Sequence, residues 1–265
     1  MMATPMRMAR WQLIVLVLVT GVALAYVATR LSPVAATLIL AAVAGLAVGA
    51  AFVPSRREEV RSENQLVAVL GTSLLAARPS APQALAQQLL AHWFRRGRRL
   101  LPVVSAESGT GSTRTVAELA RALAALGERT LVIDADFRSP RLHAEFRLPN
   151  RGGLADFLEG RSASLAHCAD NLSVLVAGRS GADPLELLSG PRVQALLAAA
   201  AQCYSVVLVD TPAAACGPDL QLFAAFGGGA LVVARRPASP RGLERLRKLL
   251  AGCKAQVVGT VIAAS

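Results

Sequence analysis

Apolar residues follow a repeating order in the second half of this 265-residue chain, where runs rich in β-branched residues alternate with stretches of helical spacing. The expected strands are Leu100–Val104, Thr130–Ile133, Leu172–Val176, Ser205–Val209, Ala230–Ala234 and Gln256–Ile262. The expected helices are Thr113–Leu126, Gly153–Leu158, Pro184–Leu188, Pro191–Cys203, Pro218–Phe226 and Pro240–Leu250. Nearly continuous apolar strands between helices predict an α/β fold, a doubly wound parallel sheet covered on both faces.

The first part of the chain contains two much longer apolar stretches. Trp11–Thr29 and Val34–Val53 are each long enough to cross a bilayer as a helix, and neither contains an acid or a lysine. A short turn with Ser32 and Pro33 joins them, so we expect residues 1–55 to form a two-helix transmembrane hairpin. A cleavable signal peptide is the alternative for the first stretch, but the second stretch argues against export.

Positive charge surrounds the expected hairpin and contributes to the formal net charge of +11. The flanking arginines are Arg7, Arg10, Arg56, Arg57 and Arg61. The positive-inside rule therefore predicts that both termini are cytoplasmic. A further cluster at Arg95–Arg99 lacks alternating aromatic residues, which favours lipid headgroups or solvent over nucleic acid.

The region between hairpin and sheet, residues 56–95, is expected to be a linker followed by an amphipathic helix. Leu85, Leu89 and Trp93 recur on one face of that helix. Residues 96–265 then form the α/β domain. The cysteines Cys168, Cys203, Cys216 and Cys253 lack paired spacing, which predicts reduced thiols and no cysteine metal site.

A glycine-containing loop, Ser105–Thr113, separates the first expected strand from the first helix. Backbone N–H groups in such a turn bind phosphate, and the helix dipole adds positive potential. We therefore assign nucleotide binding to Gly109, Thr110, Gly111, Ser112 and Thr113. The spacing fits the Walker A pattern of P-loop NTPases with one defect, because Ser112 stands where that pattern has the lysine that bridges the β- and γ-phosphates.

Carboxylates follow two of the expected strands. Asp134 and Asp136 end the second strand, and Asp210 ends a later strand in a Walker B arrangement. The carboxyl ends of parallel strands share one rim with the phosphate loop. Asp210 is expected to hold Mg²⁺ together with the Thr113 hydroxyl, although a strand-terminal Asp before Pro is also a common turn and Asp134 could cap a helix. Together these elements indicate a P-loop fold.

Several blocks of residues resemble the bacterial tyrosine autokinases of exopolysaccharide and capsule export, in particular chain-length-determinant kinases of the EpsG type. The blocks are Val104–Ala106 with the glycine loop, Gly127–Arg141, Asn150–Leu154, Leu158–Arg161, Pro184–Leu188 and Asp210–Pro212. The resemblance covers roughly Leu100 to Ile262 and implies ATP and Mg²⁺ as cofactors. It also implies a multi-pass protein of the bacterial inner membrane that works beside a polysaccharide co-polymerase.

The resemblance assigns roles to individual residues. It implies that Asp134, Asp136 and Asp210 are catalytic and that Arg138 binds the nucleotide. The metal ligands that it implies are Thr113, Asp134 and Asp210. A homo-oligomer is compatible with the resemblance and is left open.

The chain departs from this family in three places. Ser112 replaces the lysine, the helix Gln83–Phe94 lacks the Glu and Arg spacing with which relatives close a ring, and no tyrosine-rich tail follows Ile262. We therefore expect weak or absent kinase activity and a scaffold or nucleotide-sensing role. Two alternatives are an active kinase acting on another protein and a MinD/ParA-like positioning ATPase. The second requires a lysine early in the loop, where Glu107 and Ser108 stand.

Overall fold

The computed structural model describes residues 65, 70, 74–76 and 82–263. The chain divides into two compact units, Met1–Arg57 and Glu58–Ser265, and every described residue lies in the second. The expected hairpin at residues 1–55 and most of the expected linker thus lie outside the described residues. Within the described part of the chain, no helix is both long and apolar enough to cross a bilayer.

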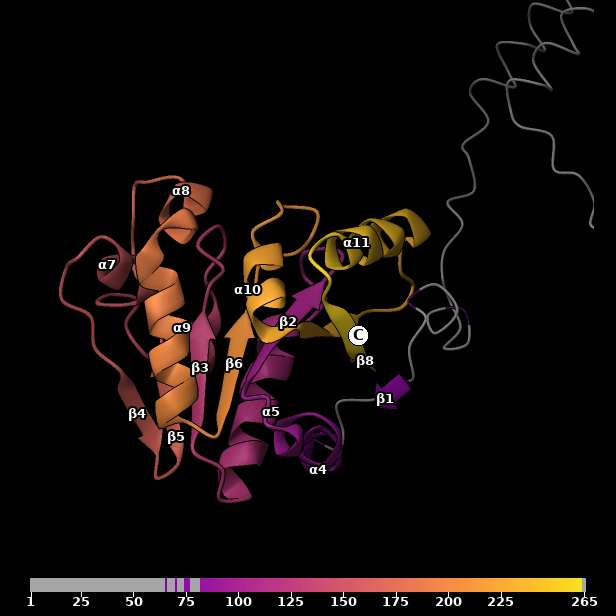
Figure 1. Ribbon diagram of the computed structural model, residues 1–265, viewed down its shortest axis with the longest axis horizontal. Helices are drawn as coiled ribbons and strands as arrows, with labels where there is room; N and C mark the ends of the chain where they lie inside the picture. Colours follow the sequence, from indigo (N-terminus) through magenta and orange to yellow (C-terminus); the bar gives the residue numbers. More distant parts are fainter. Residues whose placement is uncertain (1–64, 66–69, 71–73, 77–81, 264–265) are drawn as a thin grey trace, which may run out of the picture. The chain divides into compact units, whose positions relative to one another are not determined.

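The described strands form one eight-stranded sheet with the order β1-β8-β7-β2-β6-β3-β5-β4 (Figure 1). Their bounds are β1 Leu74–Ala76, β2 Leu100–Ser105, β3 Thr130–Asp134, β4 Ala166–Ala169, β5 Leu172–Leu175, β6 Val206–Asp210, β7 Gly229–Ala234 and β8 Gln256–Ile262. All neighbours pair in parallel except β4, which is antiparallel to β5. The predicted parallel sheet is therefore confirmed in its centre and wrong at the β4 edge.

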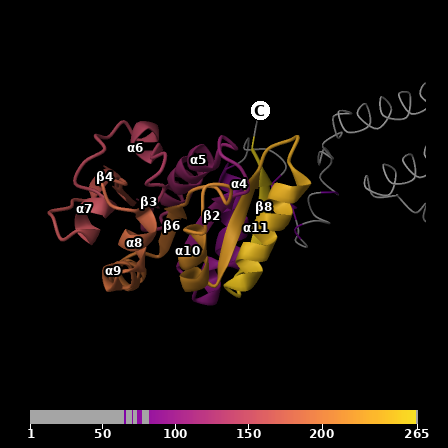
Figure 2. The same cartoon turned by 90° about the horizontal axis from the view of Figure 1, so that it is seen from above.

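Helices cover both faces of this sheet, as Figure 2 shows from above. Their bounds are α4 Pro82–His92, α5 Ser112–Ala125, α6 Leu142–Glu145, α7 Leu154–Leu158, α8 Pro184–Ser189, α9 Pro191–Cys203, α10 Leu220–Gly227 and α11 Pro240–Gly252, with a short 3₁₀ turn η1 at Phe94–Arg96. One core packs α4 and α5 against the sheet. Two further cores, under α10 and α11 and under α7 to α9, fill the other face.

The side chains of the central strands point alternately to the two faces of the sheet, which explains why helices cover both faces. On β6, Val206 and Leu208 belong to the core under α4 and α5, whereas Val207 and Val209 belong to the core under α9. Successive side chains of a strand point to opposite faces, so a strand that is apolar at every position must be buried on both. The strands β3 and β6 each end in an aspartate, Asp134 and Asp210, at the carboxyl rim of the sheet.

The predicted amphipathic helix is confirmed as α4. Leu85, Leu89 and Trp93 are all buried in the first core. The Trp93 indole N–H donates a hydrogen bond to the Leu100 carbonyl oxygen at 3.3 Å, and the Arg98 guanidinium lies 4.4 Å from the ring centre. The helix thus packs into the same unit as the sheet, and its last turn supports the beginning of β2.

Three elements were missed by the apolar pattern. The edge strands β1 and β4 are short, and most of β4 is exposed, so it carries no apolar run. The helix α6 is a single turn of four residues. All six predicted strands and the main predicted helices are present, with ends that differ by at most two residues.

The contact between Trp93 and β7 provides a test of this packing. A Cβ atom added to Gly229 would lie 2.6 Å from Cη2 of Trp93 and 2.9 Å from the Gln256 carbonyl oxygen. We expect Gly229→Ala to lower the free energy of unfolding by about 1 to 3 kcal/mol, because overpacking a filled core costs that much. Urea denaturation of the full chain measures the change. Gly181→Ala is the matched control, since a Cβ there meets nothing within 4 Å, and equal stability of the two variants would contradict the packing.

Candidate functional site

The loop between β2 and α5 has the backbone of a phosphate cradle. Gly109 and Gly111 have φ angles of +73° and +86°, in the left-handed region that favours glycine. Gly111 caps α5, and its carbonyl oxygen accepts the N–H and the hydroxyl of Thr115, both at 2.9 Å. The N–H groups of the following first turn have no intrahelical acceptor and are available to an anion.

A pocket of about 140 Å³ lies beside this loop. Four of the residues expected to bind nucleotide line it: Gly109, Gly111, Ser112 and Thr113. Its other walls come from the ends of β2, β3 and β6 and include Ser105, Asp136, Ser139 and Thr211. The loop and the strand ends therefore meet at one rim, as the sequence predicts.

Thr110 faces a different space. It is buried, its hydroxyl has no hydrogen-bond partner among the described residues, and it lines a second pocket of about 190 Å³. That pocket also contains Arg235, Pro237 and Ser239 from the segment after β7. Both pockets are lined by Ser108 and Gly109, so the loop is bordered by two cavities.

Asp210 is the most unusual polar residue in this region. The register of β3 and β6 places it opposite Asp134, its side chain is buried, and neither carboxylate oxygen has a hydrogen-bond partner among the described residues. Burial raises the pKa of Asp210 well above its ordinary value, the neighbouring Asp134 raises it further, and the nearby Thr113 hydroxyl opposes the shift. Unpartnered buried carboxylate oxygens fit a cation or a retained proton.

Asp134 is also fully buried, but its oxygens have partners. Oδ1 accepts the backbone N–H of Asp136 at 3.1 Å, and Oδ2 accepts that of Leu142 at 3.2 Å. Burial raises the pKa of Asp134 to about 7, against the lowering effect of these hydrogen bonds. Asp134 therefore holds the segment after β3 in place, and its contact with Leu142, the first residue of α6, agrees with the alternative that Asp134 caps a helix.

Of the two remaining residues of the expected site, Asp136 lines the pocket and Arg138 does not. The Asp136 Oδ1 accepts the N–H groups of Arg138 and Ser139 at 3.1 and 2.9 Å. The Arg138 guanidinium instead donates to both oxygens of the buried Asp219, at 2.9 and 3.4 Å. Asp219 was not found from the sequence, because it belongs to no motif and lies 81 residues away.

Two arginines line the pocket, and no lysine does. They are Arg114, in the first turn of α5, and Arg141, just before α6. Two acids, Asp136 and Glu145, line it as well. Ser112 therefore leaves the loop itself without a cationic side chain, as expected from the sequence.

The described residues contain no group of three or more His, Cys, Asp or Glu side chains placed to hold a metal ion. Mg²⁺ is usually bound through one or two carboxylates plus phosphate oxygens and water, so a nucleotide would have to complete its shell. The unpartnered oxygens of Asp210 and the nearby Thr113 hydroxyl fit that arrangement.

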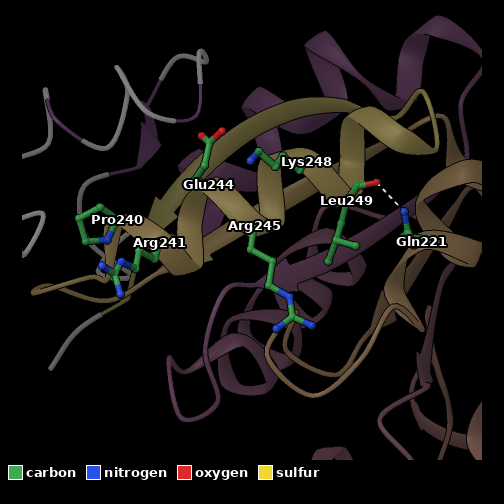
Figure 3. A pocket seen from close by; sticks show the side chains of 7 residues that line it. All are labelled: Gln221, Pro240, Arg241, Glu244, Arg245, Lys248 and Leu249. Atoms are coloured by element: carbon green, nitrogen blue, oxygen red, sulfur yellow. Dashed lines mark hydrogen bonds between the residues drawn. The ribbon is translucent and has the colours of Figure 1, made fainter. Parts of the chain in front are cut away.

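A larger space of about 630 Å³ lies elsewhere, along α11 (Figure 3). Its lining residues are Gln221, Pro240, Arg241, Glu244, Arg245, Lys248 and Leu249. The Gln221 side-chain amide donates to the Leu249 carbonyl oxygen at 2.8 Å and joins α10 to α11 (Figure 3). This surface has neither a glycine turn nor a buried carboxylate, so we place the candidate site at the loop.

Comparison with known proteins identifies the family of the domain. Residues 101–263 match the family of CobQ/CobB/MinD/ParA nucleotide binding domains. The tyrosine-protein kinase YwqD of Bacillus subtilis is 32% identical over 165 residues, which are 60% of this chain and 70% of that protein. The tyrosine-protein kinase wzc of Salmonella typhi is 30% identical over 178 residues, 65% of this chain but 24% of that protein. The solved kinase domain of the Escherichia coli tyrosine kinase ETK has a TM-score of 0.66 at 26% identity, with 70% of this chain and 75% of that chain covered.

The buried carboxylates predict a pH dependence of stability. The pKa of Asp134 lies near 7 in the folded chain, against an ordinary value of 3.8, and that of Asp210 is also raised. Between these values the folded state binds more protons than the unfolded state, so the stabilisation is present at low pH and is lost as pH rises. One pKa unit corresponds to about 1.4 kcal/mol, so we expect the free energy of unfolding to fall by about 4 kcal/mol across this window from Asp134 alone, and Asp210 changes it in the same direction.

Thermal unfolding of the full chain at pH 5 and pH 8, without nucleotide or divalent metal, measures this dependence. Asp210→Asn should partly flatten it, whereas Asp170→Asn, at an exposed turn, should leave it unchanged. Identical pH dependence in the wild type and Asp210→Asn would show that Asp210 is not the buried acid described above.

Proposed function

Since this chain belongs to the bacterial tyrosine kinase family, with its CobQ/CobB/MinD/ParA-type nucleotide-binding domain, we propose that it binds ATP with Mg²⁺ at the loop between β2 and α5 but transfers phosphate slowly. The observation that carries the proposal is the pairing of a complete backbone cradle with a neutral Ser112. Its role is then regulatory or structural, as a nucleotide sensor or scaffold in exopolysaccharide synthesis.

The residues present fit such a ligand in three ways. Ser112 and Thr113, in the first turn of α5, line the pocket, and the free N–H groups of a first helical turn suit phosphate oxygens. Asp210 and Thr113 would hold Mg²⁺, which neutralises charge on the phosphates. The second pocket, beside Thr110 and Pro237, is a suitable place for the nucleoside.

The missing lysine affects transfer more than binding. Negative charge moves onto the bridging and leaving oxygens during phosphate transfer, and a cation placed there stabilises the transition state more than the ground state. Ser112 offers a neutral hydroxyl, so it can donate a hydrogen bond without supplying charge. Binding through backbone N–H groups is preserved, because it depends on the turn and not on the side chain.

The tyrosines support an acceptor outside this chain, if phosphate is transferred at all. The sequence contains two, Tyr26 and Tyr204. Tyr204 directly follows α9 and packs against the core under α7 to α9, so its ring is held in the fold. Tyr26 lies outside the described residues. A kinase reaction in trans on another protein is therefore the second function that we keep.

We further propose that the hairpin at residues 1–55 anchors the protein in the bacterial inner membrane with both termini cytoplasmic. The two uncharged apolar stretches and their flanking arginines support this placement. The partner that we propose is a polysaccharide co-polymerase of the same membrane. Its support is the resemblance of the kinase-like blocks, together with a tether that would keep the nucleotide site close to the membrane.

Replacing Ser112 by lysine tests the proposed cause of slow transfer. We expect Ser112→Lys to raise ATP turnover on the order of a hundredfold, because loss of one transition-state contact typically costs that much or more. Phosphate release by the full chain in detergent measures the rate. Ser112→Ala is the matched control and should show no increase, and Asp210→Asn should abolish the gain. Wild-type turnover as fast as that of Ser112→Lys would refute the proposal.

The proposed topology is tested by cysteine accessibility in intact cells. A single cysteine placed at Ser265, in a variant whose four native cysteines are replaced by serine, should be labelled by a membrane-impermeant reagent only after the cells are opened. The control is a cysteine at Ser32, in the expected periplasmic turn, which should react in intact cells. Labelling of position 265 from outside would exclude this topology.

A further inference from the structure

The replacement of lysine by Ser112 leaves a specific electrostatic problem. A triphosphate in the pocket would bring several negative charges close to Asp136 and Glu145, which already line it. A cation facing the phosphates is needed to offset them, beyond the neutral N–H groups of the loop. The two candidate cations in the pocket wall are Arg114 and Arg141.

Arg114 is already engaged on the helix surface. Its Nε donates to Oε1 of Glu118 at 2.8 Å, one turn further along α5, and its side chain is 74% exposed. Arg138, the arginine that the sequence assigned to the nucleotide, forms the bidentate pair with Asp219. Either arginine would have to break an existing ion pair before it could contact a phosphate.

Arg141 differs from both. Its side chain has no hydrogen bond or ion pair with any residue in the described part of the chain, and it is exposed at the pocket wall. Its backbone, in contrast, is fixed. The Arg141 carbonyl oxygen accepts the N–H groups of Ala144 and Glu145 at 3.0 and 3.3 Å, and the adjacent Leu142 N–H is held by the buried Asp134 carboxylate.

This combination suits a phosphate ligand. A guanidinium has five N–H donors in a planar fork that matches two phosphate oxygens, and it remains charged at any physiological pH. Because the backbone of Arg141 is fixed, the positions that its guanidinium can reach are restricted to the region of the pocket. Asp134, the last residue of β3, fixes this backbone, because its carboxylate accepts the N–H of Leu142.

We propose that Arg141 supplies the cationic phosphate contact that Ser112 cannot, from the β3 side of the pocket, and that Asp134 positions it. This inference rests on the proposed nucleotide site. It gives Asp134 a positioning role through the backbone of Arg141 and Leu142. Arg141 is then a binding residue specific for the polyphosphate part of the ligand and not for the nucleoside.

The test is a double-mutant cycle on nucleotide binding by the full chain in detergent, measured by calorimetry with ATP and Mg²⁺ and separately with AMP. Arg141→Gln should weaken ATP binding roughly tenfold or more, as expected for loss of a charge-assisted contact, and leave AMP binding within about twofold. In the Ser112→Lys background the same change should cost about threefold or less, because the lysine supplies the charge and the two positions are coupled.

Matched controls separate this effect from damage to the fold. Arg245→Gln removes an exposed arginine of α11 outside both cavities of the loop and should not change ATP binding. Arg141→Lys keeps the charge but not the planar fork, so it should recover only part of the affinity that Arg141→Gln loses. Thermal unfolding of each variant shows whether a loss of binding reflects a loss of structure.

The outcomes are distinct. Equal ATP affinity in the wild type and Arg141→Gln, or an equal cost of Arg141→Gln in both backgrounds, would overturn the role of Arg141 and leave the proposed nucleotide site intact. Absence of ATP binding in both the wild type and Ser112→Lys would refute the proposed function itself. Binding by Ser112→Lys alone would refute ATP binding by the wild type, and with it both the proposed function and the role of Arg141.

Discussion

The buried pair of Asp134 and Asp210 is the constraint on which the candidate site depends. The β3–β6 register sets the two residues side by side at the centre of the rim, where both side chains are shielded from water. Two carboxylates placed together without water disfavour double ionisation. The fold resolves this asymmetrically, because Asp134 accepts two backbone N–H groups while Asp210 accepts none among the described residues. Burying an ionised carboxylate without a partner destabilises the fold, and a bound cation or proton would remove that destabilisation.

Backbone hydrogen bonds also join the chain segments that form the rim. The Ala135 N–H donates to the Asp210 carbonyl oxygen at 2.8 Å, and the Ala214 N–H donates to the Ser105 carbonyl oxygen at 2.8 Å. The chain segments that leave β2, β3 and β6 are thereby joined to one another before any side chain acts. Below the rim, every position of these strands is buried, so shifting one strand would expose apolar residues on both faces. The core therefore maintains the alignment that the site requires.

The sequence predicted those features that depend on local pattern. Continuous apolar strands, helices of 3.6-residue spacing, the glycine turn and the two strand-end acids were all found, because each is encoded within about a dozen neighbouring residues. The β4 edge was not, since its exposed residues carry no periodic signal. The Arg138–Asp219 pair was missed because it joins positions 81 residues apart, and this long-range contact changes what Arg138 can bind. The sequence allowed helix capping by Asp134 but did not identify its partners, because a motif gives the identity of a carboxylate but not the direction of its oxygens.

The replacement at position 112 separates two properties that a P-loop normally combines. Ground-state affinity for phosphate comes largely from N–H groups, which the strand–turn–helix geometry fixes regardless of side chain, whereas acceleration of transfer requires charge where the transition state develops it. A substitution confined to the side chain can therefore reduce the second property and preserve the first. On our proposal, bound nucleotide would then persist for longer in this chain than in a relative with the lysine. A long-lived bound state is more useful for holding a partner in one conformation than for phosphorylating it, because a ligand shifts a conformational equilibrium only while it remains bound. The buried Asp210 carboxylate, which accepts no hydrogen bond within the described part of the chain, supports that division, since it offers a place for a cation beside a loop that lacks its lysine.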